Sequence, residues 1–338
     1  PRIICDLLNP PPSAKQQVPL DVSYIEAAFR TLSFIFRYDA QVLLDQEACL
    51  EPMRRYYSVT LAHRRDIVRR LAAESFAPLV RKLGKKRHLK RILRALVASQ
   101  NTDERLRQDA VDGIAQLFFE VARGAAGKVH SKGNTLAIHC IADFVIDHPN
   151  EVVFNVASAF FERLCGHLNT SSMAPVVMKL VRSAEDCSNS TALSYLLRLV
   201  TQVLGRKNSI FLKQQQHMVN VVTSLLKGKV ERFGSLTMDS RESSADLLFS
   251  LWRAFPDDVD LASLLTSLLR DKMSAKVADT TLAYRVVKDL VPYLPVETAT
   301  VHIGSAVLSN ATMMNDPSAA VTLMHALASV QQASDVDT

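Results

Sequence analysis

The sequence has few of the residues that interrupt helices. In 338 residues there are 10 glycines and 13 prolines, while Leu, Ala, Val, Arg and Ser dominate. A fold of many short strands and tight turns needs more glycine and proline than this. The scarcity excludes most strand-rich architectures and favours helix as the default secondary structure.

Cysteine is also scarce, and its spacing excludes two classes of small domain. The five cysteines are odd in number, widely scattered and never form a C-x-x-C pair: Cys5, Cys49, Cys140, Cys165 and Cys187. Neither a disulfide framework nor a zinc module is built from such a pattern. The pattern favours a reducing intracellular compartment.

Long apolar runs are absent. No stretch approaches the roughly 18 unbroken apolar residues that span a bilayer. The longest candidate, residues 152–161, is interrupted by Asn155 and Ser158. The chain begins at Pro1 without a charged n-region and an apolar h-region, so we predict no secretory signal and interpret the sequence as a piece of a longer protein.

No nucleotide-binding or catalytic motif is complete. Gly127 and Lys128 resemble the end of a phosphate-binding loop, but the spacing from Gly124 is wrong, and Val129 stands where a Ser or Thr is required. The sequence contains no G-x-S-x-G elbow, no H-E-x-x-H and no Rossmann fingerprint. We therefore predict no catalytic residue, no cofactor and no small-molecule substrate.

Metal binding is equally unsupported by the sequence. His139 is next to Cys140, and Cys165 lies two residues before His167. Such near neighbours on one helix point to different faces and cannot share an ion. The acids at 257, 258 and 260 follow a proline and suit the start of a helix, where they complement its dipole. We predict no metal site.

What the sequence does contain is helical periodicity. Residues 1–20 include three consecutive prolines and are interpreted as an extended segment. Asp21 is a good N-cap, and Phe29, Leu32 and Phe36 recur after it at helical spacing. Further amphipathic helices are predicted at about 41–58, 64–83, 86–98, 103–123, 134–147, 151–168, 172–184, 190–204, 211–227, 241–255, 259–271, 276–291, 296–309 and 317–331.

Taken in pairs, these helices form a unit of about 40 residues, the period of HEAT and armadillo arrays. Residues 66–76 fit the D-x-V-R-x-x-A pattern of a second HEAT helix, and we expect Asp66 and Arg69 to bridge adjacent repeats. The predicted fold class is all-α: a HEAT/armadillo-like α-solenoid of about seven helical-hairpin repeats over residues 21–331. Residues 332–338 are predicted to be a flexible tail.

Positive charge is concentrated in one window. Between Pro52 and Leu96 there are fourteen basic residues and two acids, Asp66 and Glu74. The window nets +12 and the chain +6, so the remaining residues net −6. A local basic block on an otherwise acidic chain is typical of a docking surface for a polyanion, because neutralised phosphates release counterions.

The helix predicted at 86–98 arranges this charge on one side. Leu89, Ile92, Leu93, Leu96 and Val97 form its apolar stripe. The break at Gly84 projects neighbouring cations from the repeat edge. We predict nine polyanion-contacting residues: Arg64, Arg65, Arg69, Lys85, Lys86, Arg87, Lys90, Arg91 and Arg94.

Two other interpretations of the basic block stay open. The cations can face an acidic protein partner, or they can form a solvated face. Tyr56 and Tyr57, beside Arg54 and Arg55, suit stacking on unpaired bases, although core packing is the commoner role for such tyrosines.

Three segments around this block resemble a known family. They are residues 29–37, residues 61–82 with Ala72–Phe76 followed by Arg81 and Lys82, and residues 113–131 with Phe119 and Glu120 followed by Gly124. They are similar to the N-terminal region of the down-regulated-in-metastasis family, the large HEAT-repeat, U3 snoRNA-associated scaffold proteins of the small-subunit processome. The resemblance covers about residues 22–133. One departure is Pro78, which removes a backbone donor within the predicted helix.

The resemblance implies a non-enzymatic scaffold in ribosome biogenesis. Such a protein organises pre-ribosomal RNA and assembly factors during small-subunit rRNA processing in the nucleolus. The implied partners are pre-ribosomal RNA, processome proteins and the U3 snoRNA particle, with no membrane. The residues themselves favour the same broad class. The alternatives are a HEAT-repeat protein-binding scaffold or transport-receptor-like adaptor, or a solenoid that binds anionic lipid head groups.

Overall fold

The computed structural model describes residues 22–38, 57, 59–98, 104–123, 131–168, 170–205, 216–231, 236–255, 261 and 264. Every element within these ranges is a helix. The helices are α2 (Val22–Tyr38), α5 (Asp66–Leu83), α6 (Lys86–Ala98), α7 (Glu104–Ala122), α8 (Ser131–Asp147), α9 (Glu151–His167), α10 (Thr170–Glu185), α11 (Ser190–Gly205), α13 (Gln216–Glu231) and α14 (Met238–Ala254). None of these described helices is both long and apolar enough to cross a membrane.

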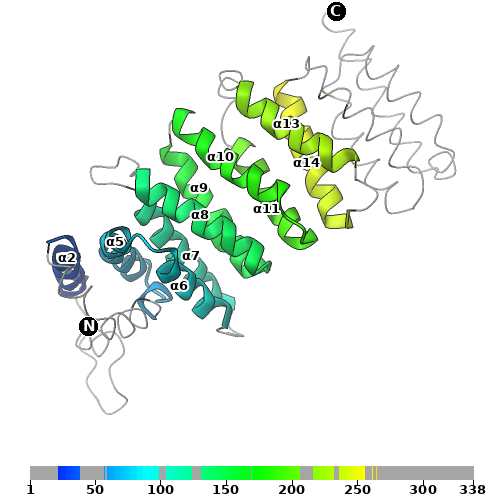
Figure 1. Cartoon of the computed structure of the whole chain (residues 1–338). Coiled ribbons are helices and arrows are strands. Elements are labelled where there is room, and N and C mark those ends of the chain that lie inside the picture. The colour runs from blue at the N-terminus through cyan, green and yellow to red at the C-terminus, as the bar shows by residue number, and fades with distance from the viewer. Residues whose placement is uncertain are drawn as a thin grey trace, which may run out of the picture. The chain divides into compact units, whose positions relative to one another are not determined.

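The chain divides into two compact units, residues 1–179 and 180–338. In the first unit the helices form two layers (Figure 1). Helices α2, α5, α7 and α9 pack side by side in one layer, while α6 packs on α8 in the other. Helices α5, α6 and α7 therefore each contact the helix two places along the chain, which is the stacking pattern of helical-hairpin repeats.

The described part of the second unit also consists of helices packed on one another. Helix α11 packs extensively on α14, and α13 packs on α14. Two serines join α11 to α14: Ser194 and Ser243 share a hydrogen bond of 2.8 Å, although both are buried. Ser240 Oγ also donates to the Ser190 carbonyl at 2.8 Å, so hydrogen bonds satisfy several buried hydroxyl groups where these two helices meet.

The described helices confirm the all-α, HEAT/armadillo-like fold class. Predicted and observed boundaries agree within about three residues for most helices. Helix α8 begins three residues before the predicted 134, and α13 begins five residues after the predicted 211. Pro78 lies buried inside α5, which continues to Leu83. A proline is tolerated there at the loss of one intrahelical hydrogen bond.

Several predictions lie outside the described residues. They concern the extended segment 1–20, most of the helix at 41–58, the helices at 276–291, 296–309 and 317–331, most of 259–271, the tail 332–338, the Gly124–Lys128 loop, Tyr56, Cys5, Cys49 and the acids at 257, 258 and 260.

Aromatic side chains form the core of the first unit. Tyr57 is fully buried, and its ring stacks on Phe76 with centroids 3.9 Å apart. Its hydroxyl lies 3.2 Å from the Ser75 Oγ. Core packing, the commoner of the two roles weighed for this tyrosine, is therefore the one observed.

Candidate nucleic-acid interface

The turn between α5 and α6 lies within the basic window and consists of Gly84 and Lys85. Gly84 ends α5 in the left-handed conformation, with φ of 60°, and its N–H donates to the Val80 carbonyl at 3.0 Å. Glycine takes this backbone shape without steric cost. Lys85 follows as an exposed residue, and α6 begins at Lys86.

Helix α6 separates apolar and cationic side chains cleanly. Leu89, Ile92 and Leu93 are buried, as predicted. Val97 is half-buried, and the side chain of Leu96 lies outside the described part. Arg87, Arg91 and Arg94 are exposed and recur at four- and three-residue spacing, so they share one face. Because the apolar face of α6 is buried against the protein, the face that carries the arginines is turned toward solvent.

Two lysines of α6 are engaged by acids of α8. Lys86 Nζ lies 2.7 Å from Asp143 Oδ2, and Lys90 Nζ lies 2.8 Å from Asp147 Oδ2. Lys179 also contacts Asp143, at 3.1 Å. Burial works against ionisation of Asp143, but hydrogen bonds from Lys86 and Lys179 outweigh it and lower its pKa. These carboxylates offset the repulsion among the cations of α6.

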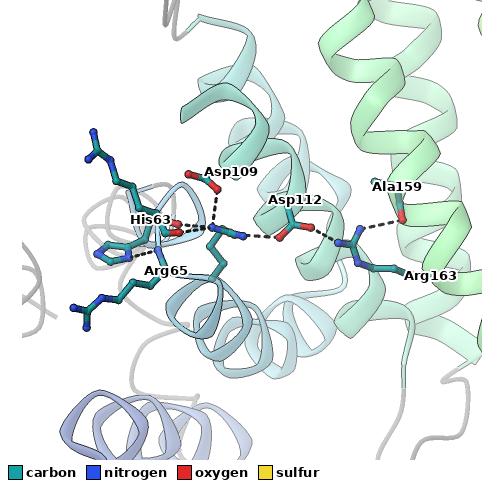
Figure 2. A network of polar contacts seen from close by, with 8 residues as sticks. His63, Arg65, Asp109, Asp112, Ala159 and Arg163 are labelled. Atoms are coloured by element: carbon teal, nitrogen blue, oxygen red, sulfur yellow. Dashed lines mark hydrogen bonds and ion pairs between the residues drawn. The ribbon is translucent and has the colours of Figure 1, made fainter. Parts of the chain in front are cut away.

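Arg69 requires a correction, because its guanidinium is not on the surface. The residue is 8% exposed. Its Nη1 donates to Asp109 Oδ1 at 2.8 Å, and its Nε donates to Asp112 Oδ2 at 3.1 Å (Figure 2). Nη1 also donates to the carbonyls of His63 and Arg64. Because Nε and Nη1 donate to acceptors inside the protein, we expect Arg69 to make no polyanion contact.

The same side chains form a ladder across three repeats. Asp112 of α7 accepts from Arg69 of α5 and also from Arg163 of α9, whose Nη1 donates to the Ala159 carbonyl at 3.1 Å (Figure 2). The expectation that Arg69 bridges adjacent repeats is thus confirmed. Because the Arg69 side chain is 10% exposed, its pairing is sensitive to the loss of either charge.

His63 marks the start of this network. Its Nδ1 accepts from the Arg65 N–H at 3.1 Å, so in this hydrogen bond the imidazole is an acceptor (Figure 2). Burial lowers the pKa of His63, and the charges of Arg65 and Arg69 lower it further. A neutral imidazole at this position holds the chain immediately before α5.

A notch of about 430 Å³ adjoins the α5–α6 turn. Gly84 and Lys86 line one side, and Lys132, Thr135 and His139 of α8 line the other. Sequence reasoning misses Lys132 because the apolar pattern of this helix starts after it. His139 was considered only as a metal ligand; here it lines the notch, while the buried thiol of Cys140 lies 3.8 Å from the Lys86 carbonyl.

Among the nine predicted contact residues, six present exposed cations: two lie just before α5, one lies in the α5–α6 turn and three lie on α6. We call them the α5–α6 basic surface: Arg64, Arg65, Lys85, Arg87, Arg91 and Arg94. Lys86 and Lys90 lie at its edge in ion pairs, and Lys132 adds an exposed cation beside the notch. Such a surface supplies charge without base-reading geometry, which suits phosphate contacts.

A scan against models of known protein families gave no match. Among solved structures, the chain is similar to the karyopherin Kap121p in a crystal structure of its complex with the SUMO protease Ulp1p. The similarity covers 91% of this chain and 37% of the karyopherin chain, at 13% identity and a TM-score of 0.38. The chain therefore spans well under half of that karyopherin's length.

Proposed function

We propose that this protein is a non-enzymatic repeat scaffold that binds structured RNA through the α5–α6 basic surface. The supporting observation is the cation arrangement. Four exposed basic side chains lie in the α5–α6 turn and on one face of α6, two more lie just before α5, and the chain outside the basic window is net acidic. Grouped cations release the counterions condensed on RNA when they neutralise its phosphates, and each phosphate contact adds to the affinity.

The resemblance over residues 22–133 adds a finer proposal. The scaffold acts in ribosome biogenesis, in the nucleolus, and organises pre-ribosomal RNA, processome proteins and the U3 snoRNA particle during small-subunit rRNA processing. Lys86 and Lys90 form ion pairs with acids of α8. These pairs hold α6 in place and so fix the orientation of its exposed arginines toward RNA.

The test is binding of the full chain to a stem-loop RNA across a salt series. The variant is the double charge reversal Arg91→Glu and Arg94→Glu, two exposed cations of α6, and it keeps Lys86 and Lys90 with their ion pairs to α8. If the surface contacts phosphates, the log-log salt slope falls by about one for each phosphate that is no longer neutralised. The matched control reverses two exposed cations elsewhere, Arg182 and Lys227, and keeps the original slope.

An equal loss of affinity in the control would show that only net charge matters. Salt-insensitive or absent RNA binding by the unmodified chain would overturn the RNA proposal and favour an acidic protein partner. Sedimentation with anionic liposomes in parallel separates phosphates of RNA from those of lipid head groups. The finer proposal predicts that depletion of the protein in cells causes small-subunit rRNA precursors to accumulate; unchanged precursor levels would contradict it.

A further inference from the structure

A second surface of the first unit combines open space with exposed aromatic rings. A groove of about 950 Å³ runs between α2 and α5 and reaches the end of α7. Its floor includes the buried side chains of Phe29 and Leu71. At its rim, Phe34 is 63% exposed and Tyr38 is 74% exposed.

These two rings form one apolar face on α2. They are four residues apart, and their centroids lie 4.7 Å from each other. In the described part of the chain, the large exposed apolar side chains are Phe34, Ile35, Tyr38 and Val59, so three of the four are at the end of α2. Aromatic side chains exposed beside a groove are typical anchors for a binding partner.

The groove walls are also cationic. Five basic residues line it and only two acids, Glu74 and Glu120: the basic residues are Arg30, Arg37, Arg81, Lys82 and Arg123. Arg81 is half-buried, with its guanidinium donating to the carbonyls of Glu120 and Arg123. Burial lowers the pKa of Arg81, while the charge of Glu120 raises it and that of Arg37 lowers it. Arg30 pairs with Glu26 and Arg123 with Glu120, yet the residues that line the groove include three more cations than acids, an excess that favours an anionic ligand.

We infer that this groove docks an acidic peptide segment of a partner protein, one that carries an aromatic or large aliphatic anchor. The charge of the walls is complementary to acidic side chains, and the Phe34 and Tyr38 rings are complementary to the anchor. A peptide fits better than RNA, because Glu74 and Glu120 lie in the walls. A nucleic acid brings a phosphate at every nucleotide and would meet both carboxylates, whereas a peptide can place uncharged residues there.

The experiment is selection of a random peptide display library on the full chain, followed by affinity measurement of the enriched peptides. Acidic peptides with an apolar anchor are expected. The variants Phe34→Ala with Tyr38→Ala, and separately Arg37→Glu, are expected to weaken these peptides about tenfold or more, the loss typical of a central anchor. Both changes are at exposed positions, and circular dichroism checks that the helices persist.

Matched controls come from the same molecule. Ile35→Ala removes an apolar side chain of α2 that does not line the groove, and Arg94→Glu reverses a cation of the α5–α6 basic surface. Both should keep peptide affinity within about twofold. The inference is overturned if no acidic peptide is enriched, or if the enriched peptides bind the groove variants as tightly as the unmodified chain.

This inference stands apart from the proposed RNA function, and the two fail separately. Phe34→Ala with Tyr38→Ala should leave the salt slope of RNA binding unchanged. Arg91→Glu with Arg94→Glu should leave peptide affinity unchanged. If the groove variants abolish RNA binding instead, the aromatic rings stack on bases and the peptide assignment is wrong.

Discussion

Gly113 of α7 lies where no larger residue fits. A Cβ added at this position would be 1.9 Å from the carbonyl oxygen of Leu61, and that atom belongs to backbone rather than to a flexible side chain. The close approach of Leu61 to α7 therefore depends on glycine, even though glycine is a poor helix former.

We expect Gly113→Ala to lower the free energy of unfolding by about 1–3 kcal/mol, because the clash outweighs the gain in helix propensity. Urea unfolding of the full chain, followed by circular dichroism, measures this. Gly166→Ala is the control in the same unit, since a Cβ there meets nothing within 4 Å. Equal effects of the two substitutions would contradict the packing explanation.

Arg69 and its neighbour Arg70 offer a second comparison at the residue scale. The Arg69 side chain is 10% exposed and paired with Asp109 and Asp112, whereas that of Arg70 is 59% exposed and lies 3.9 Å from Glu74. Arg69→Ala should cost about 2 kcal/mol, because Asp109 loses its arginine partner and Asp112 keeps only Arg163. Arg70→Ala should cost less than about 0.5 kcal/mol.

The RNA affinity of these two variants tests whether Arg69 lies outside the interface. Under conditions where both remain folded, Arg69→Ala should bind the stem-loop RNA no more weakly than Arg70→Ala does. A selective loss of RNA affinity in Arg69→Ala would return Arg69 to the interface.

His63 makes stability depend on pH. Its pKa in the folded chain is below the ordinary value of 6.5. At a pH between these two values, the unfolded chain therefore binds more protons than the folded chain. The stability contributed by neutral His63 is present above pH 6.5 and is lost as the pH falls towards its folded pKa. His139, whose pKa burial also lowers, acts in the same direction.

Thermal unfolding should therefore begin at a lower temperature at about pH 5.5 than at about pH 7.5. His63→Asn keeps an acceptor for the Arg65 N–H but does not titrate, so the difference in Tm between the two pH values should shrink. An undiminished difference in the variant would mean that other groups govern the acid response.

At the scale of elements, two ion pairs join α6 to α8, and they partly neutralise Lys86 and Lys90. Asp143→Asn with Asp147→Asn should raise hydrogen exchange along α6, because both ion pairs are removed. The same change frees Lys86 and Lys90 and should strengthen RNA binding at low salt by about threefold, or ~0.7 kcal/mol. Weaker RNA binding would show that the orientation of α6 matters more than its charge.

Amphipathic spacing was enough to predict these elements. In α6, Leu89, Ile92 and Leu93 recur at helical intervals, and the helix buries them as their spacing predicts. The start of α8 was placed too late because Ser131, Lys132 and Gly133 carry no apolar signal. A helix start with polar residues depends on capping and neighbouring elements, which periodicity does not report.

At the scale of the whole molecule, the charge is divided between sequence windows rather than spread evenly. The window 52–96 nets +12 and the rest of the chain −6. In a crosslinking experiment with the full chain and the stem-loop RNA, we expect crosslinked peptides from α5 and α6 and none from α11, α13 or α14. Crosslinks mainly in the second unit would move the RNA site away from the basic window.

The sequence by itself determined the helical repeat class and the location of the basic block. Both are local properties: apolar spacing decides which side of a helix is buried, and charge content is a sum over neighbours. The tertiary structure alone decided how each cation is used. Arg69 lies beside Asp109 and Asp112, which are distant in sequence, and Lys86 and Lys90 meet acids of α8. Pairing between repeats depends on how helices stack in space, which the sequence pattern does not report. Basic residues that look alike in the sequence therefore differ in the structure: some form buried bridges between repeats, some form ion pairs, and some are exposed cations.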